Sequence, residues 1–276
     1  MVVKHICLTG GAFGMVYQIG AISAAKSAAK SAAKRSKYIF YGCSAGALAA
    51  AMTLLGYSDE EFLQFYNHTS DQVAANMVKR PFEYSTYNLT IPNFEIFRRI
   101  NADHPDAYKI LTKKRLHIGV TLETGFRWFK RFHSNEELFN ILLCSYHVPF
   151  LCSYNATIGG VKCIDGGFGI DHDTDLPPKT LIICPKHVDS GRFDVLNGEM
   201  TVKACAMPSP LEERMDYYAQ GYKDMRLYIK NGKCSKTISG KIDEDIVPNS
   251  VWWLLRSLQP DDTNYTIERL EISIFA

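Results

Sequence analysis

Short apolar runs alternate along the chain with longer stretches in which apolar and polar positions follow helical spacing. The short runs that we interpret as strands are residues 2–8, 38–41, 117–122, 127–132, 161–164 and 180–184. The longer stretches that we interpret as helices are residues 15–35, 45–56, 59–111 in two or three pieces, 134–145 and 211–231. Strands that alternate with helices in this way predict an α/β domain.

Two local patterns refine this prediction. Ser58 precedes a helical stretch and Glu61 stands at its third position, which is the pattern of a capping box. Three Ser-Ala-Ala-Lys repeats place Lys26, Lys30 and Lys34 at every fourth position of an earlier helix. This spacing favours a solvated lysine stripe opposite a smooth alanine face, and attraction of the stripe to anionic lipid is the alternative.

The composition limits the classes of function. The 276 residues carry a formal net charge of +2, which is too small to indicate a nucleic-acid surface. The eight cysteines show neither a Cys-x-x-Cys pair nor zinc spacing, so we expect reduced thiols, no metal and no cofactor. The first residues form a predicted strand, and no segment approaches the ~18 apolar residues of a membrane span. We therefore expect a cytoplasmic protein whose membrane contact, where it occurs, is peripheral.

The pentapeptide Gly42-Cys43-Ser44-Ala45-Gly46 lies between the second predicted strand and an alanine-rich helix. This is the G-x-S-x-G pattern of a nucleophile elbow, in which a tight turn needs small flanking residues and pushes the serine outward. Ser44 would stand at the positive N-terminal end of the following helix. Ser44 is therefore the candidate nucleophile.

A glycine-rich loop, residues 10–14, follows the first strand and opens the next helix. If the first two strands are parallel neighbours, this loop and Ser44 emerge at the same edge of the sheet. The N–H groups of the loop would then be placed to stabilise an oxyanion. Dinucleotide binding fits badly, because Thr9 stands where G-x-G-x-x-G needs a glycine and no acidic residue lies about twenty positions further on.

A serine hydroxyl also needs a base that takes its proton. In an α/β-hydrolase the order is serine, acid and histidine, and among the histidines after Ser44 only His172 lies near a candidate acid. The serine is very early for that fold. The alternative base is Asp165, which ends a predicted strand and is followed by Gly166 and Gly167, so that the chain can turn tightly beside it.

The glycine-rich loop, the Ser44 pentapeptide and the Asp165 turn together resemble the patatin-like phospholipases, which are serine lipid acyl hydrolases with a Ser–Asp dyad and no histidine. Further segments resemble the animal branch of that family, which includes adipose triglyceride lipase and adiponutrin; these are residues 135–138, 142–150 and 220–224. The resemblance implies a three-layer α/β/α fold around a central, mostly parallel sheet.

The resemblance also implies roles by position. Ser44 would be the nucleophile, and Asp165 would accept its proton and return it to the leaving alcohol. The N–H groups of Gly10, Gly11 and Ala12 would form the oxyanion hole. The glycines that would support these motifs are Gly14, Gly42, Gly46, Gly166 and Gly167.

The implied activity is hydrolysis of carboxylic esters in glycerolipids or phospholipids through an acyl-enzyme. A transacylase that uses the same dyad, and a catalytically weak lipid-binding or regulatory protein, are the alternatives. The implied partners are the lipid substrate and the surface of a membrane or lipid droplet, with no nucleic acid. The implied hydrolase domain spans residues 1–234, with residues 235–276 as a C-terminal extension packed on the same domain.

Two departures from the family pattern bear on these expectations. Many members read G-G-G-x-Lys/Arg-G, whereas this chain has Ala12 and Phe13 and no basic residue in the loop, which motivates the catalytically weak alternative. Residues 168–177 are longer and more acidic than the usual segment after Asp-Gly-Gly. Aromatic residues at 126–132 and 252–253 are candidates for lipid contact, although packing inside the protein is the favoured interpretation.

Overall fold

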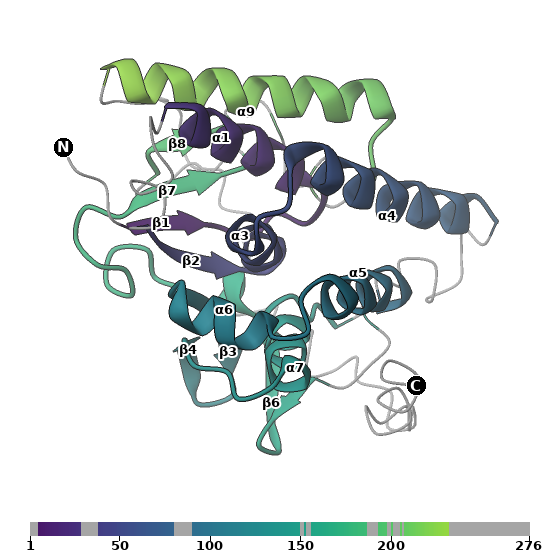
Figure 1. Cartoon of the computed structure of the whole chain (residues 1–276), viewed down its shortest axis with the longest axis vertical. Coiled ribbons are helices and arrows are strands. Elements are labelled where there is room, and N and C mark those ends of the chain that lie inside the picture. The colour runs from purple at the N-terminus through teal and green to yellow at the C-terminus, as the bar shows by residue number, and fades with distance from the viewer. Residues whose placement is uncertain are drawn as a thin grey trace, which may run out of the picture.

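The computed structural model describes residues 5–28, 38–79, 90–149, 152, 156–186, 193–197, 200, 205 and 207–231. This part of the chain is a mixed α/β fold in which helices flank a central, mostly parallel sheet (Figure 1). The predicted fold class is therefore confirmed. The predicted C-terminal extension, residues 235–276, lies outside the described residues, and so does its aromatic pair at 252–253.

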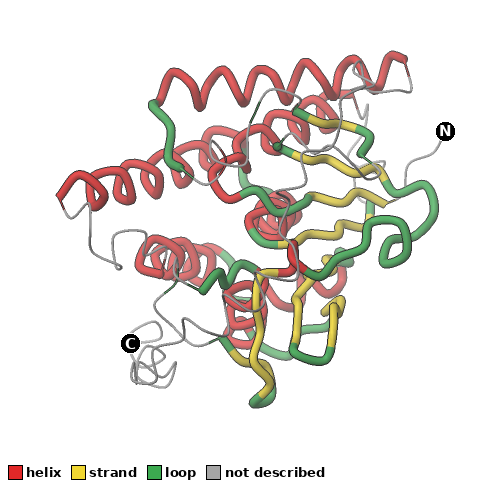
Figure 2. Tube along the Cα trace, turned by 180° about the vertical axis from the view of Figure 1, so that it is seen from behind, coloured by secondary structure: helices red, strands yellow, loops and turns green. Residues whose placement is uncertain are grey.

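The strands form one twisted sheet, seen from behind in Figure 2. They are β1 (His5–Leu8), β2 (Ile39–Cys43), β3 (Leu116–Leu122), β4 (Gly125–Phe129), β5 (Thr157–Ile158), β6 (Val161–Asp165), β7 (Leu181–Cys184) and β8 (Val195–Leu196). The order is β5-β6-β3-β2-β1-β7-β8, with β4 paired to β3 beside this path. The neighbours from β3 to β8 pair in parallel, whereas β4 and β6 run antiparallel to β3.

The helices occupy the stretches between the strands. They are α1 (Met15–Ala28), α3 (Ala45–Leu55), α4 (Asp59–Lys79), α5 (Thr90–Asp103), α6 (Ala107–Lys113), α7 (Asn135–Ser145) and α9 (Leu211–Asn231). Two short 3-10 turns, η1 (Ala12–Gly14) and η3 (Gly166–Phe168), follow β1 and β6. The predicted helix over 211–231 is confirmed at both ends.

The main core lies between the sheet and the helices. Successive residues of a strand point to opposite faces. Ile6 and Leu8 of β1 accordingly pack into the large apolar cluster with the helices. Cys7 and Ile182 belong to a smaller cluster with Leu176, which lies in the loop before β7. The acidic loop that follows Asp165 thus contributes an apolar side chain to the sheet.

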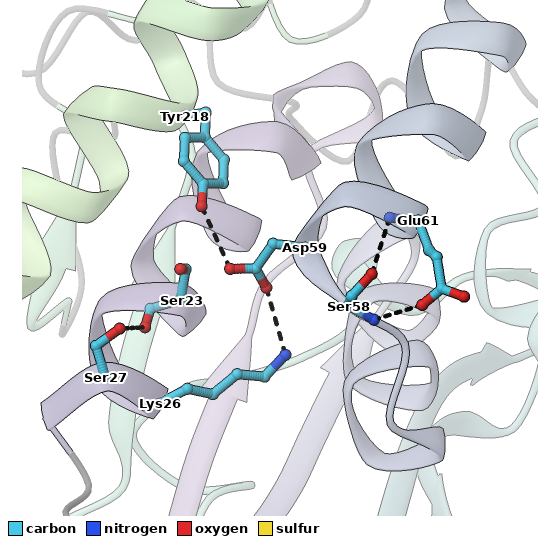
Figure 3. Close-up of polar contacts among 7 residues, drawn as sticks. All are labelled: Ser23, Lys26, Ser27, Ser58, Asp59, Glu61 and Tyr218. Carbon is cyan, nitrogen blue, oxygen red and sulfur yellow. Dashed lines mark hydrogen bonds and ion pairs between the residues drawn. The ribbon is translucent and has the colours of Figure 1, made fainter.

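The predicted capping box is present at the start of α4 (Figure 3). The Ser58 N–H donates to Glu61 Oε2 over 2.8 Å, and the Glu61 N–H donates to Ser58 Oγ over 3.2 Å. Two of the N–H groups that a helix start leaves without a partner are satisfied in this way. The local sequence therefore determines where α4 begins.

Lys26 is the member of the predicted lysine stripe that the structure describes; Lys30 and Lys34 lie outside the described residues. Its Nζ lies 3.5 Å from Asp59 Oδ1, and Tyr218 Oη donates to Asp59 Oδ2 over 3.3 Å (Figure 3). Asp59 therefore connects α1, α4 and α9. Lys26 is part of this contact and is half-buried, with 28% of its side chain exposed.

Helices α1 and α9 pack backbone to backbone, and Figure 1 shows α9 lying along the outer side of α1. A Cβ on Gly20 would lie 2.0 Å from the Tyr218 carbonyl oxygen, and a Cβ on Gly221 would lie 2.0 Å from the Tyr17 carbonyl oxygen. Tyr17 Oη also donates to Asp224 Oδ2 over 2.8 Å. The two glycines permit a separation that side chains would prevent.

The predicted strand over 127–132 is shifted, because β4 ends at Phe129. Phe132 lies in the loop after β4, and its side chain is buried in the main core, which accounts for an apolar residue at this position. Its backbone N–H donates to Thr112 Oγ1 over 3.1 Å. Strands β5 and β8 were not predicted. Each has two residues, which is too short for an alternating pattern.

Replacing Gly221 with Ala is expected to destabilise the protein. Alanine is favoured over glycine by about 1 kcal/mol inside a helix, but its Cβ would force α9 away from the Tyr17 carbonyl. Overpacking costs about 1–3 kcal/mol, and a clash with rigid backbone lies at the upper end of that range, so we expect a net loss of about 2 kcal/mol in urea denaturation followed by circular dichroism. Lys223→Ala, at an exposed position of α9, is the control. A Gly221→Ala protein as stable as the wild type would contradict the close crossing.

Candidate active site

Ser44 lies at the turn between β2 and α3. Its backbone has φ 56° and ψ −137°, a conformation that residues other than glycine rarely adopt. The flanking glycines leave no room for a side chain. A Cβ on Gly42 would lie 2.5 Å from Ala47 Cα, and a Cβ on Gly46 would lie 2.3 Å from the Leu8 carbonyl oxygen. The strained turn is therefore packed directly against the backbone of β1.

The glycine-rich loop borders Ser44, because β1 and β2 are parallel neighbours. This is the condition under which the loop and Ser44 share one edge of the sheet. Leu8 lies opposite Gly42 in this pairing, so both loops leave the same edge of the sheet. A Cβ on Gly10 would lie 3.1 Å from Ser44 Cβ and 3.7 Å from Asp165 Oδ1. Gly10 therefore lies directly beside the side chains of both Ser44 and Asp165.

The rest of the loop is held by its own turn and by β7. The Gly14 N–H donates to the Gly11 carbonyl oxygen over 2.7 Å. A Cβ on Gly11 would lie 2.2 Å from Pro185 Cγ, so the loop packs on the residue that follows β7. Ala12 has φ 41°, in the left-handed region that favours glycine. The alanine at this position therefore adopts a glycine-like backbone.

Asp165 ends β6, and its buried side chain meets Ser44. Asp165 Oδ1 accepts the Gly167 N–H over 2.7 Å, and the Ser44 hydroxyl lies close enough to the carboxylate to favour its ionised form. A Cβ on Gly10 would lie 3.7 Å from both Ser44 Oγ and Asp165 Oδ1. Gly166 allows the turn to approach β3, because a Cβ there would lie 2.1 Å from the Gly119 carbonyl oxygen. The structure thus brings Ser44, which follows β2, close to Asp165, which ends β6, although 121 residues separate them along the chain (165 − 44).

The environment of Asp165 makes its carboxylate more basic than usual. Burial raises the pKa of Asp165 to about 6, from an ordinary value of 3.8. The Ser44 hydroxyl, the hydrogen bond from the Gly167 N–H and the positive charge of Lys186 oppose this rise in pKa, because each favours the ionised form. The carboxylate is therefore mainly ionised at neutral pH and can accept a proton slightly below it.

His172, the other base that the residues alone left open, lies elsewhere. Its ring packs edge-on against Phe193, with centroids 5.2 Å apart. Burial lowers the pKa of His172, which disfavours its charged form. Within the described residues, no hydrogen bond joins it to Ser44 or Asp165. The geometry therefore pairs Ser44 with the carboxylate.

Residues that the sequence patterns did not single out support the two side chains. The Asp165 N–H donates to the His147 carbonyl oxygen, and Thr121 Oγ1 donates to the Asp165 carbonyl oxygen, each over 2.9 Å. The Ser44 N–H donates to Ser145 Oγ over 2.9 Å. These contacts join distant parts of the chain, so no local pattern marks them. The available signal was the family-like segment 142–150, which contains both Ser145 and His147.

Replacing Asp165 with Asn is expected to stabilise the protein at neutral pH and not in acid. The raised pKa means that the folded state favours the protonated carboxyl, so this stability is fully present below about pH 4 and is lost as the pH rises through about 6. Asn stays neutral, so the gain in unfolding free energy should grow from near zero at pH 4 to about 3 kcal/mol above pH 7.

Denaturant titrations of both proteins across this pH range measure the difference. Asp216→Asn, at an exposed position of α9, is the control and should change the unfolding free energy by less than about 0.5 kcal/mol. A gain for Asp165→Asn that does not vary with pH would contradict the raised pKa.

Comparison with known proteins places this geometry in a family. Residues 6–176 match the family described as patatin-like phospholipase. The chain is 28% identical over 250 residues to omega-hydroxyceramide transacylase from Homo sapiens, covering 82% of this chain and 45% of that protein. It is 30% identical over 250 residues to the Mus musculus protein of the same name, covering 82% and 40%.

Two further similarities are more distant. The chain is 22% identical over 254 residues to the Mus musculus 1-acylglycerol-3-phosphate O-acyltransferase Pnpla3, covering 83% of this chain and 60% of that protein. Among solved structures, the type III effector protein ExoU aligns with a TM-score of 0.42 at 13% identity, covering 83% of this chain and 53% of that chain.

The chain spans 40% to 60% of the length of these curated relatives. The family match runs from β1 to beyond Asp165, and so includes the glycine-rich loop, the elbow and the Asp-Gly-Gly turn. This protein belongs to the patatin-like phospholipase family.

Proposed function

We propose that this protein is a serine lipid acyl hydrolase that cleaves carboxylic esters of glycerolipids or phospholipids through an acyl-enzyme on Ser44. The observation that carries this proposal is the approach of the Ser44 hydroxyl to the buried carboxylate of Asp165, beside the glycine-rich loop. Membership of the patatin-like phospholipase family supports a lipid ester as the substrate class.

In the first step, Asp165 acts as the general base. It accepts the hydroxyl proton of Ser44 while Ser44 Oγ forms a bond to the carbonyl carbon of the ester. Asp165 then returns this proton to the leaving alcohol as the ester C–O bond breaks, and the acyl group stays on Ser44. A pKa of about 6 suits both halves of this step, because the group can hold and release a proton near neutral pH.

The negative charge that develops on the carbonyl oxygen needs N–H donors. The Ser44 N–H is already engaged with Ser145 Oγ, so the donors come from another segment. We assign them to the N–H groups of Gly10, Gly11 and Ala12, because this loop borders Ser44. The glycine-like backbone of Ala12 supports the assignment, since the loop keeps its turn although the residue has a side chain.

Transfer of the acyl group to an alcohol is a second candidate function. The same acyl-enzyme can be released by water or by another hydroxyl, and the dyad is unchanged. Similarity to proteins named as a transacylase and as an O-acyltransferase favours this route. Incubation of radiolabelled phospholipids and acylglycerols, with and without an added acceptor alcohol, separates the two functions by their labelled products: free fatty acid for hydrolysis and a new ester for transfer.

We also propose that the protein meets its substrate at a lipid surface, from the cytoplasmic side. Phe168 lies three residues after Asp165 and is 38% exposed, which supports contact with acyl chains beside the site. Trp128, from the predicted contact segment 126–132, instead packs edge-on against Tyr41 with ring centroids 5.1 Å apart. Among the helices that the structure describes, none is long and apolar enough to cross a membrane.

Ser44→Ala and Asp165→Ala are each expected to lower ester hydrolysis by about 1,000-fold or more, because one removes the nucleophile and the other removes its base. A fluorophosphonate probe should label the wild type and leave Ser44→Ala unlabelled. Circular dichroism checks that both variants are folded, and Asp216→Asn is the active control. Wild-type activity in Ser44→Ala would refute the proposed dyad, and a folded wild type without labelling would favour a catalytically weak lipid-binding protein.

The rate of labelling is expected to depend on pH through Asp165. Only the carboxylate can accept the Ser44 proton, so the rate should rise about tenfold per pH unit in acid and reach a plateau above about pH 6. The measurement is the rate constant of fluorophosphonate labelling between pH 4.5 and 8.5. A rate constant that stays flat over this interval would exclude Asp165 as the base.

A further inference from the structure

The side chain of Ser145 connects the backbone of Ser44 to the backbone of β3. It is the last residue of α7, and its side chain is completely buried. Its hydroxyl accepts the Ser44 N–H over 2.9 Å and donates to the Gly119 carbonyl oxygen over 2.7 Å. One hydroxyl therefore uses its donor and an acceptor position at once, and both of its partners belong to the backbone.

The two partners lie where direct pairing between β2 and β3 stops. Gly119 of β3 is opposite Cys43, which is the last residue of β2. The next residue, Ser44, turns out of the strand with φ 56°, and its N–H reaches β3 through Ser145. A rare backbone conformation persists only when its surroundings hold it. The Ser145 hydroxyl holds this one at the Ser44 N–H, while the Ser44 carbonyl oxygen accepts the Ala47 N–H over 2.9 Å within the turn into α3.

The same short segment also holds Asp165. Two residues after Ser145, the His147 carbonyl oxygen accepts the Asp165 N–H over 2.9 Å. The Gly119 carbonyl that Ser145 contacts is in turn packed against Gly166. Residues 145–147, at the end of α7 and just after it, therefore contact the backbone of both Ser44 and Asp165.

We propose that Ser145 is a positioning residue: its hydroxyl holds the backbone of Ser44 so that the Ser44 side chain faces the Asp165 carboxylate. The inference rests on the proposed function, in which that contact starts the reaction. Small displacements of a nucleophile from its partner are costly, and about 1 Å can lower a rate about 100-fold. Ser145 touches neither substrate nor reacting atoms in this scheme and acts through Ser44.

The test compares Ser145→Ala with Ser70→Ala, because Ser70 is another completely buried serine, on α4 and outside the site. For Ser145→Ala we expect the rate constant of fluorophosphonate labelling and the kcat for a soluble ester to fall about 10- to 100-fold. KM should change little, since no contact with substrate is lost. The final extent of labelling should equal that of the wild type, and Ser70→Ala should keep the wild-type rate constant.

The extent of labelling separates positioning from a purely structural role. A structural defect would lower the fraction of molecules that label and leave the rate constant of the remainder unchanged, and that result would overturn the proposal. The acidic limb of the pH profile should stay at the same pH in Ser145→Ala, because the surroundings of the Asp165 carboxylate are retained. A wild-type rate constant in folded Ser145→Ala would also overturn it.

A second pair of variants applies if Ser145→Ala does not fold. Ser145→Thr keeps the hydroxyl, whereas Ser145→Val has a side chain of the same shape as threonine but no hydroxyl. Faster labelling of Ser145→Thr than of Ser145→Val supports the proposal, and equal labelling rate constants for these two variants refute it. A wild type that neither labels nor hydrolyses esters would instead refute the proposed function itself, which keeps the two failures distinguishable.

Discussion

The parallel pairing of β1 with β2 is the constraint on which the candidate site depends. With Leu8 opposite Gly42, the loop after β1 and the elbow after β2 leave the sheet at the same edge, and Gly10 comes to lie against Ser44. Contact at this distance requires backbone against backbone, because a Cβ on Gly46 would lie 2.3 Å from the Leu8 carbonyl oxygen. The glycines around the site are therefore a consequence of strand pairing.

The site combines two unfavourable features that the surrounding fold holds in place. Ser44 adopts a rare backbone conformation, and the Asp165 carboxyl group is buried, which disfavours its ionised form and raises its pKa to about 6. The rare conformation is held by packing on β1 and by the Ser145 hydroxyl, and the buried carboxylate is stabilised by the Gly167 N–H and the nearby Ser44 hydroxyl. Strain and raised basicity at one place are typical of sites that do chemistry.

Much of the fold could be predicted because its signals are local. The bounds of α9 and the capping box at Ser58 depend on side chains within a few residues of each other, and both were predicted correctly. The short strands β5 and β8 were not predicted, since two residues cannot show an alternating pattern. The end of β4 was placed too late, because Phe132 is apolar as a buried loop residue and not as part of a strand. The parallel pairing of β1 with β2, which the sequence left as a condition for the loop to meet Ser44, is present in the structure.

By itself, the sequence determined the elbow around Ser44, the glycine-rich loop and an aspartate followed by two glycines, because tight turns leave a pattern of small residues. The residues alone left both Asp165 and His172 open as partners of Ser44. Only the tertiary structure shows which of the two side chains lies beside Ser44: β6 runs antiparallel to β3 and brings Asp165 close to it, and this position is the basis of the proposed dyad. The raised pKa and the support from Ser145 also belong to the tertiary structure, because burial and hydrogen bonds between distant segments leave no local pattern in the chain.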